Sequence, residues 1–377
     1  MKRDARRDRQ CGSAQCRRAG QTMSFGLNKP QVSPIAVDFG VSSLKVLQVI
    51  PGNSNDSPTL IGAASLSTPD ELLSDDQQRL AYQSEQLPKL MRGMGFKGKR
   101  AVCAVSALQC LAQSVQVQKA GNIPLADIVK EQLRQAIGRD PASFVLRTFE
   151  VGEVVRSGQK CTEVLCMAIP REVVMMHMKA LRQARLDPVG IQTEHMSVLR
   201  AFDPLVQRSN EPNAPSMYVD FGCGSTKVLI AHGRNPVLAK TLPAYSRSGE
   251  QMMSRRPSTI AEQEAGASGT TTAVLDEVTD AGAGVEALAE EVGMCLRYYQ
   301  ALFPGKAMER AVFVGGEARR SEVCRAVARS LRLPAQVADP LSALARESGS
   351  SIRGLALQSA QPGWAVPIGL CLSPTDL

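Results

Sequence analysis

Two short segments of the chain carry residue types that bind phosphate groups. Val37–Leu47 and Val219–Leu229 are identical at eight of eleven positions, and the second copy begins 182 positions after the first. Each copy has an Asp that closes an apolar run, a turn with glycine, hydroxyl side chains and a Lys. The residues concerned are Asp38, Gly40, Ser42, Ser43 and Lys45 in the first copy, and Asp220, Gly222, Gly224, Ser225, Thr226 and Lys227 in the second.

This pattern has the chemistry of a phosphate-binding hairpin. Glycine lets the backbone turn sharply, so that successive N–H groups can point at a phosphate, and hydroxyl groups add donors. Asp38 and Asp220 would hold Mg²⁺ through retained waters, because Mg²⁺ gives up water reluctantly. Lys45 and Lys227 either meet phosphate oxygens or are solvated strand residues. One copy alone would fit an ordinary β-hairpin, but two copies at domain-scale spacing favour two similar halves facing one nucleotide.

A third segment offers a place for a flat ligand. Val312–Ala318 is an apolar strand that runs into Gly315, Gly316 and Glu317, and a helical pattern follows over 320–331. Gly-Gly at a strand-to-helix junction permits close backbone approach to a ligand such as a nucleobase.

Together the three segments resemble the two phosphate motifs and the adenosine motif of the actin, heat-shock-70 and sugar-kinase ATPase superfamily. Within it, the order of segments is most similar to the PilM family of type IV pilus assembly proteins, and next to the FtsA division proteins. Three further segments carry this likeness. They are Ala168–Val174, which opens a helix to Arg185, Pro188–Glu194, which leads into a helix over His195–Phe202, and Trp364–Leu370, which is similar to the family's closing connection helix.

The resemblance implies an α/β fold of actin-like (ribonuclease H-like) duplicated domains with an inserted small α+β subdomain. The first domain would comprise residues 33–106 and 162–207, the insertion 107–161 and the second domain 208–372. ATP and Mg²⁺ are implied as cofactors. The inserted subdomain would dock the N-terminal peptide of an inner-membrane pilus protein resembling PilN.

Local patterns predict the elements of each part. The first domain should contain strands over 34–39, 43–50, 58–67 and 100–106, and a helix to about Gly93 whose N-cap is Thr68. The insertion should contain strands over 110–117, 144–151 and 161–169 and an amphipathic helix over 124–137. The second domain should contain strands over 216–221, 225–232 and 236–242, a turn that includes His232, and a helix over 285–303.

The composition limits where the protein can be located and which partners it can bind. The chain has 377 residues, 44% of them hydrophobic, and no apolar run of the roughly 18 residues that cross a bilayer. It shows no signal-peptide pattern, so we expect a cytoplasmic protein, peripheral at the inner membrane through partners only. With 4% aromatic residues and no basic–aromatic interleaving, nucleic-acid binding is not expected. The ten Cys and three His have no metal-site spacing.

Two segments are not expected to fold as part of a packed domain. Residues 1–32 form a basic extension that we expect to be disordered, and residues 1–18 alone carry a net charge of +5, out of +8 for the chain. Met23 is an alternative start to Met1. Residues 253–284 are rich in Ser, Thr, Ala and Gly and are expected to be mobile or loosely helical.

The leading hypothesis is an actin-like, ATP-binding scaffold for a type IV pilus or a related secretion machine. Glu194, at the connection between the halves, is the best candidate for activating water. The alternative is that its side chain is an ordinary helix-capping or surface carboxylate. The cleft would close on ATP and open after release. Hydrolysis, where present, should be slow.

Three alternatives stay open. A metabolic kinase of the same superfamily would need a clear Asp near Glu194 to deprotonate a sugar hydroxyl, and none is found. An FtsA-like division protein predicts a C-terminal amphipathic membrane helix, for which Leu370–Leu377 is too short. The third alternative is a degenerate fold that no longer binds nucleotide. Both phosphate motifs retain their Asp and Gly, which argues against it. Whether copies of the chain form a homo-oligomer is also open.

Overall fold

The computed structural model describes most of the chain from Val32 onward. The described residues are 32–52, 56–118, 123–138, 140–156, 158–209, 211–244, 280–355 and 358–373. The basic extension lies outside them except for Val32. The low-complexity stretch lies outside them up to residue 279, and its last residues begin a helix.

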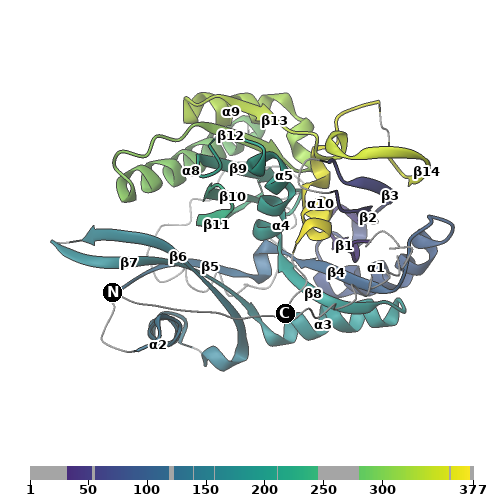
Figure 1. Cartoon of the computed structure of the whole chain (residues 1–377), viewed down its shortest axis with the longest axis horizontal. Helices are drawn as coiled ribbons and strands as arrows, with labels where there is room; N and C mark the ends of the chain where they lie inside the picture. The colour runs from purple at the N-terminus through teal and green to yellow at the C-terminus, as the bar shows by residue number, and fades with distance from the viewer. Residues whose placement is uncertain are drawn as a thin grey trace, which may run out of the picture. The chain divides into compact units, whose positions relative to one another are not determined.

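The first domain is built on a six-stranded sheet in the order β14-β3-β2-β1-β4-β8. Its strands are β1 (Ile35–Phe39), β2 (Ser43–Ile50), β3 (Thr59–Ser67), β4 (Arg100–Val105), β8 (Asp187–Thr193) and β14 (Ala345–Arg353). β1, β2 and β3 form an antiparallel meander, β4 runs parallel to β1, and β8 runs parallel to β4. Helices α1 (Asp76–Met91) and α3 (Arg171–Gln183) cover one face, while α10 (Ala365–Leu372) lies on the other (Figure 1).

The first helix begins later than its sequence signal indicated. Asp70–Leu72 form a single 3-10 turn, and α1 begins at Asp76 with Asp75 as its N-cap. Oδ1 of Asp75 accepts the first free N–H groups of the helix, which is the function that the sequence assigned to Thr68. The prediction of Thr68 as the N-cap was therefore wrong. Its hydroxyl instead accepts a hydrogen bond from Gln83 Nε2 at 2.9 Å.

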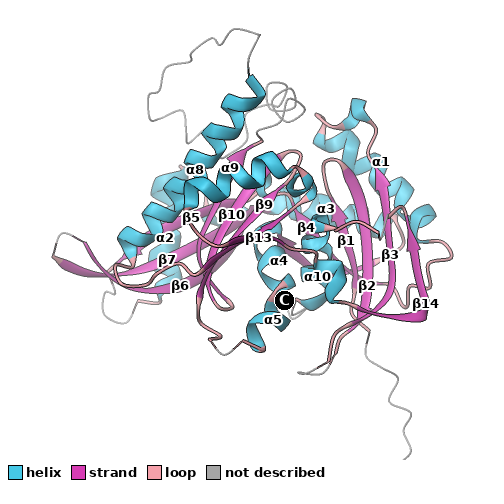
Figure 2. Ribbon diagram, turned by 90° about the horizontal axis from the view of Figure 1, so that it is seen from above, coloured by secondary structure: helices cyan, strands magenta, loops and turns pink. Residues whose placement is uncertain are grey.

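The second domain repeats the plan with a five-stranded sheet in the order β11-β10-β9-β12-β13. Its strands are β9 (Pro215–Phe221), β10 (Ser225–His232), β11 (Asn235–Pro243), β12 (Arg310–Val314) and β13 (Ala335–Val337). Helices α8 (Asp280–Leu302) and α9 (Ser321–Leu331) pack on the outer face (Figure 2). His232 ends β10 instead of lying in the turn, because it pairs with Asn235 of β11 and Pro215 of β9, and its Nε2 lies 2.8 Å from the Tyr299 hydroxyl.

The inserted subdomain is a three-stranded antiparallel sheet in the order β5-β7-β6. It contains β5 (Leu111–Val117), α2 (Leu125–Ile137), β6 (Phe144–Arg156) and β7 (Gln159–Pro170). The apolar face of α2, with Val129 and Leu133, packs on Val117 and Val164 of the sheet. The other face of the sheet packs toward β11 of the second domain.

Two domain boundaries differ from the sequence expectation. The sheet of the insertion extends to Pro170, past the expected end at 161, because β7 pairs along its whole length with β6. β14 lies in the first domain's sheet, although 208–372 was assigned to the second domain, because it pairs in parallel with β3. The chain therefore returns to the first domain before it ends in α10.

The two domains meet on a pair of central helices. α4 (Glu194–Ala201), followed by α5 (Asp203–Gln207), leads out of the first domain, and α10, which follows β14, packs against α4. Both α4 and α10 lie between the two sheets in Figure 1. A Cβ on Gly369 of α10 would overlap the carbonyl oxygen of Ser197 of α4, so the two backbones are in direct contact. Among the helices that the structure describes, none is both long and apolar enough to span a membrane. The arrangement is the expected duplicated actin-like fold with an inserted subdomain.

Candidate functional site

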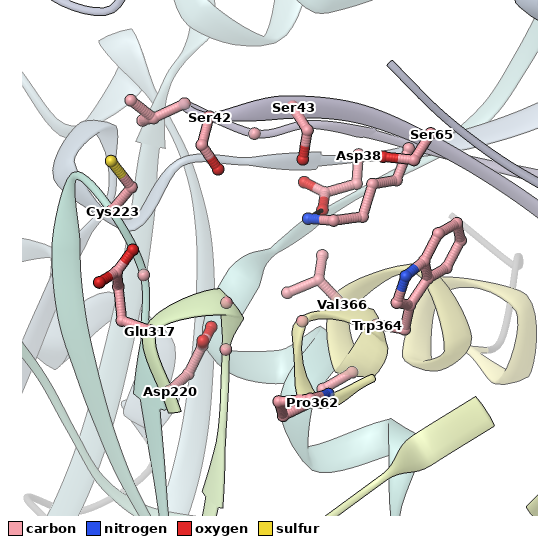
Figure 3. Close-up of a pocket in the computed structure, with 18 of the residues that line it drawn as sticks. Asp38, Ser42, Ser43, Ser65, Asp220, Cys223, Glu317, Pro362, Trp364 and Val366 are labelled. Atoms are coloured by element: carbon pink, nitrogen blue, oxygen red, sulfur yellow. Dashed lines mark hydrogen bonds and ion pairs between the residues drawn. The ribbon is translucent and has the colours of Figure 1, made fainter. Parts of the chain in front are cut away.

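The two repeated hairpins face each other across a polar cleft of about 420 Å³. One is the β1–β2 turn of the first domain and the other the β9–β10 turn of the second, and the loop before α10 forms the floor (Figure 3). All site residues expected from the sequence line this cleft except Thr226. Thr226 is fully buried, because successive strand residues point to opposite faces and its neighbours Ser225 and Lys227 take the cleft side.

The two hairpins use glycine for the same reason. A Cβ on Gly40 would lie 2.9 Å from the carbonyl oxygen of Ser43, and a Cβ on Gly222 would lie 2.9 Å from that of Ser225. These distances are too short for a side chain, so both turns need glycine. The cross-strand register is also repeated, because Asp38 pairs with Lys45 and Asp220 with Lys227.

The register turns each Asp–Lys pair into an ion pair at the base of the cleft. Lys45 Nζ lies 3.4 Å from Asp38 Oδ2, whereas Lys227 Nζ lies 3.1 Å from Asp220 Oδ2 and 3.6 Å from Glu194 Oε2. Burial alone would lower the pKa of Lys227, but the Asp220 and Glu194 carboxylates outweigh it and hold the pKa above its ordinary value. Burial raises the pKa of Asp38 against the opposing effect of Lys45. Three carboxylates and two ammonium groups are thus close together at the base of the cleft.

Glu194 joins this site from the connection between the domains. Thr193 is the N-cap of α4 and accepts the N–H of Met196, so Glu194 does not serve as the cap. Its Oε2 accepts the backbone N–H of Ala107 at 2.8 Å. The side chain is 13% exposed and lines the cleft. The structure therefore places Glu194 beside the second hairpin, and not on the outer surface.

Oxygen donors suited to a hydrated Mg²⁺ are present, although the described residues contain no group of three or more His, Cys, Asp or Glu placed to bind a metal ion directly. Asp38 and Asp220 face the cleft from opposite hairpins, with Ser42 and Ser43 nearby (Figure 3). A cation that keeps several waters and also binds phosphate oxygens needs only one or two carboxylates. The donor set fits magnesium held with phosphates better than a dedicated all-protein site.

The two glycines after β12 have different surroundings. Gly315 has a φ of 94°, and a Cβ there would overlap Asp220 and the carbonyl of Phe221. Its N–H donates to the Pro362 carbonyl at 2.9 Å, which ties this turn to the loop before α10. A Cβ on Gly316 would meet nothing within 4 Å. The prediction of close backbone approach to a ligand is thus compatible with Gly316, whereas Gly315 is required by packing against the second hairpin.

Several cleft residues were not found from the sequence. They are Val41, Ser65, Ser67, Ser106, Cys223, Arg319, Gly354, Leu355, Gln361, Pro362, Gly363, Trp364, Ala365 and Val366. Most come from β3, from the segment after β14 and from the start of α10, which no repeat marks. Arg319 Nη2 bonds to Gln361 Oε1 at 2.6 Å and so joins the glycine turn to that segment. Trp364, the single Trp of the chain, is 3% exposed and faces the cleft (Figure 3).

Comparison with known proteins identifies the family. The family model described as "Type IV pilus assembly protein PilM" matches residues 36–374. The chain belongs to the PilM family. It is therefore an actin-like pilus assembly protein, and neither a metabolic kinase nor an FtsA-like division protein is favoured. No curated protein matches the chain.

One solved structure has the same fold as this chain, and two others match it more weakly. A PilM-PilN type IV pilus biogenesis complex has 22% sequence identity and a TM-score of 0.63, and the match covers 91% of this chain and 98% of that chain. The ethanolamine utilization protein EutJ from Carboxydothermus hydrogenoformans has 12% identity and a TM-score of 0.44, covering 91% and 90%. The cytoplasmic domain of EpsL, an inner-membrane component of the Vibrio cholerae type II secretion system, has 9% identity and a TM-score of 0.41, covering 91% and 94%.

Proposed function

We propose that this chain is an ATP-binding cytoplasmic scaffold of type IV pilus assembly, held at the inner membrane by a PilN-like partner. The observation that carries the nucleotide site is the pair of facing hairpins, in which Asp38 and Asp220 sit opposite lysines in the same register. Backbone N–H groups and hydroxyls of the two turns would bind the phosphates, as in other phosphate-binding turns. Gly316 and Glu317 would lie beside the nucleoside.

Mg²⁺ would complete the charge balance of the cleft. Asp38 and Asp220 are the residues that would hold it through waters, and the ion would neutralise phosphate charge when bound. Lys45 and Lys227 would then exchange part of their carboxylate contact for phosphate oxygens. Glu194 would accept a proton from an attacking water. We therefore propose ATP hydrolysis that is slow at most.

An ATP titration tests this site. The full chain is titrated with a fluorescent ATP analogue in Mg²⁺, and Trp364 emission is followed in parallel with unlabelled ATP, since that indole lies in the cleft. Asp220→Ala should abolish saturable binding, while Asp70→Ala, at an exposed Asp outside the cleft, should bind as the wild type does. Absence of binding by the wild type, or equal binding by Asp220→Ala, would reject the two-hairpin site.

We propose that the inserted subdomain docks the partner peptide. A groove of about 620 Å³ runs between α2 and β6 and ends at Arg171, whose Nε donates to the Ala142 carbonyl at 2.7 Å. In the described part of its sheet, β6 pairs only with β7, so its outer edge can accept an extended peptide. Support for the partner class comes from the match to the PilM-PilN complex.

Two valines on the same strand provide a matched test of docking. Val145 lines the groove and is 38% exposed, whereas Val155, near the hairpin tip, is 71% exposed and does not line it. Val145→Asp should weaken binding of a peptide with the N-terminal sequence of the pilus partner by at least tenfold, and Val155→Asp should not. Equal effects of the two substitutions would place the docking site elsewhere.

A further inference from the structure

A cluster of exposed basic side chains occupies one end of the first domain. We call it the basic end and define it as Arg92, Lys97, Lys99, Lys179, Arg182 and Arg185, all of which are exposed. Two of them lie on α3, one follows its end, and three lie on the segment that joins α1 to β4. They are not close in sequence, so the fold brings them together.

The topology explains the gathering. α1 leads into β4 and α3 leads into β8, and these two strands are parallel neighbours, so both helices end at the edge where the strands begin. Leu90 of α1 and Leu186 after α3 share one core cluster, and Asp187 N donates to the Lys99 carbonyl at 2.7 Å. The helices also lie side by side on the sheet (Figure 2).

The charge of the basic end is not balanced by the protein. Across the residues that the structure describes, none of its six members forms an ion pair. Asp187, opposite Arg100 in the β4–β8 register, is the acidic residue at this edge. Arg182 lies in the last turn of α3, where a cation is favoured by the helix dipole. The same explanation applies to Arg92, the C-cap of α1, but it does not extend to Lys97 and Lys99, which lie five or more residues beyond the end of that helix.

The loop at the basic end presents charge without an exposed aromatic ring. Gly93, Gly95 and Gly98 have φ values of 75°, 71° and 76°, and a Cβ on Gly95 or Gly98 would meet nothing within 4 Å. These glycines therefore serve the path of the loop and not its packing. Phe96 is half-buried, with its ring against Gly62 of β3. Single-stranded nucleic acids are usually bound by exposed stacking rings beside basic groups, and this loop has none.

We propose that the basic end binds the anionic surface of a lipid bilayer. Lipid phosphates can pair with a set of mobile basic side chains without a shaped pocket, and clusters of Lys and Arg near a membrane bind anionic lipid in this way. α3 has the docking groove at its Arg171 end and the basic end at the other, roughly 20 Å away at the usual rise per residue. The lipid contact would therefore be added to a contact made through the partner, and two linked contacts bind more tightly than either alone.

Vesicle binding by the full chain tests the proposal. The test variant reverses the charge of three residues of the basic end and is Lys97→Glu/Lys99→Glu/Arg182→Glu. The control variant makes the same charge change at exposed positions of α9 and just after it, and is Arg325→Glu/Arg329→Glu/Arg332→Glu. Co-sedimentation is measured with vesicles of phosphatidylcholine containing 30% phosphatidylglycerol, and with phosphatidylcholine alone. Both variants keep the basic residues of 1–18, so the extension cannot account for a difference between them.

The wild type and the α9 variant should bind phosphatidylglycerol vesicles, and the basic-end variant should bind at least tenfold more weakly. Binding should also fall steeply between 0.1 and 0.5 M salt, because exposed charges are screened. Equal binding by the two variants, or no binding by the wild type, would overturn the proposal. Binding of the wild type to duplex DNA in place of vesicles would overturn it in favour of a nucleic-acid surface. Circular dichroism and peptide binding, unchanged in both variants, show that the fold and the groove are intact.

Discussion

The carboxylate of Glu194 is bound to the backbone N–H of Ala107 at 2.8 Å, although 87 positions separate the two residues. The same oxygen, Oε2, lies 3.6 Å from Lys227 Nζ. Ala107 opens the 3-10 turn Ala107–Gln109, through which the chain enters the inserted subdomain, and its carbonyl lies 3.5 Å from the Thr241 hydroxyl of β11. A side chain of the cleft thus holds the entrance of the subdomain that we propose as the docking site.

Removal of this contact should loosen the entrance to the subdomain. Glu194→Ala leaves the N–H of Ala107 without its acceptor, which costs about 1–3 kcal/mol for a buried donor. Amide hydrogen exchange over 106–111 should therefore become faster than in the wild type. Glu194→Gln keeps an acceptor oxygen and should retain the protection. Wild-type exchange rates in Glu194→Ala would show that the contact does not hold this segment.

The two lysines of the cleft should differ in their contribution to stability. Lys227 is 7% exposed and serves both Asp220 and Glu194, so Lys227→Met leaves two buried carboxylates unpaired and should cost about 3–5 kcal/mol. Lys45 is 17% exposed and serves Asp38 alone. Lys45→Met should cost less, because it removes one ion pair instead of two and the charge of Lys227 still acts on Asp38. Urea unfolding of the two variants compares them directly, and equal losses would contradict the assigned network.

Magnesium should partly replace the missing ammonium of Lys227→Met. If Asp220 is a magnesium-holding residue, millimolar Mg²⁺ should raise the melting temperature of this variant more than that of the wild type, because a ligand that binds only the folded state stabilises it. The double variant Lys227→Met/Asp220→Asn should lose the effect. A rise that persists in the double variant would place the ion elsewhere.

Alanine substitutions at Gly315 and Gly316 should distinguish a glycine that is required for packing from one that is required for ligand binding. Gly315→Ala forces a side chain onto a backbone with φ of 94° and into contact with Asp220 and Phe221, which should cost about 2–4 kcal/mol. Gly316→Ala meets open space and should change stability by less than about 0.5 kcal/mol. Its effect should appear in nucleotide affinity, measured with the fluorescent analogue. A stable Gly315→Ala variant would contradict the packing at this turn.

The buried His195 should make stability depend on pH. Burial lowers the pKa of His195 to about 4 from its ordinary value of 6.5, with Lys227 and Asp220 as its charged neighbours. The unfolded chain therefore binds more protons between these values, so this contribution is complete above about pH 6.5 and is lost as the pH falls toward 4. The loss is about 3 kcal/mol, because one pKa unit corresponds to about 1.4 kcal/mol. His195→Gln should flatten the slope of the urea-unfolding free energy over this range, and an unchanged slope would assign it to His177 and His232, whose pKa values are also lowered by burial.

Local signals predicted the repeated hairpins well. Strands at 34–39, 43–50, 216–221 and 225–232 agree with β1, β2, β9 and β10 within a residue, because alternating apolar runs and glycine turns are short-range features. The start of α1 was missed, since Thr68 and Asp75 both carry capping side chains and only the packing of Gln83 on Thr68 decides between them. β14 was assigned to the wrong domain because pairing with β3 joins segments almost three hundred positions apart.

The sequence by itself determined the repeat, and with it the two Asp–Lys pairs, the glycine turns and the family to which the chain belongs. Because the two copies have the same residue spacing, their hairpins have the same register. The Asp–Lys pairs and the glycine turns therefore follow from spacing along the chain alone. Only the tertiary structure decided that Glu194 reaches Ala107, and that Trp364 and the segment after β14 line the cleft. It also decided that six basic residues from two helix-to-strand connections, α1 to β4 and α3 to β8, meet at one end. Each of these depends on how separate strands are ordered in a sheet and how helices pack on it, and no local pattern carries that order.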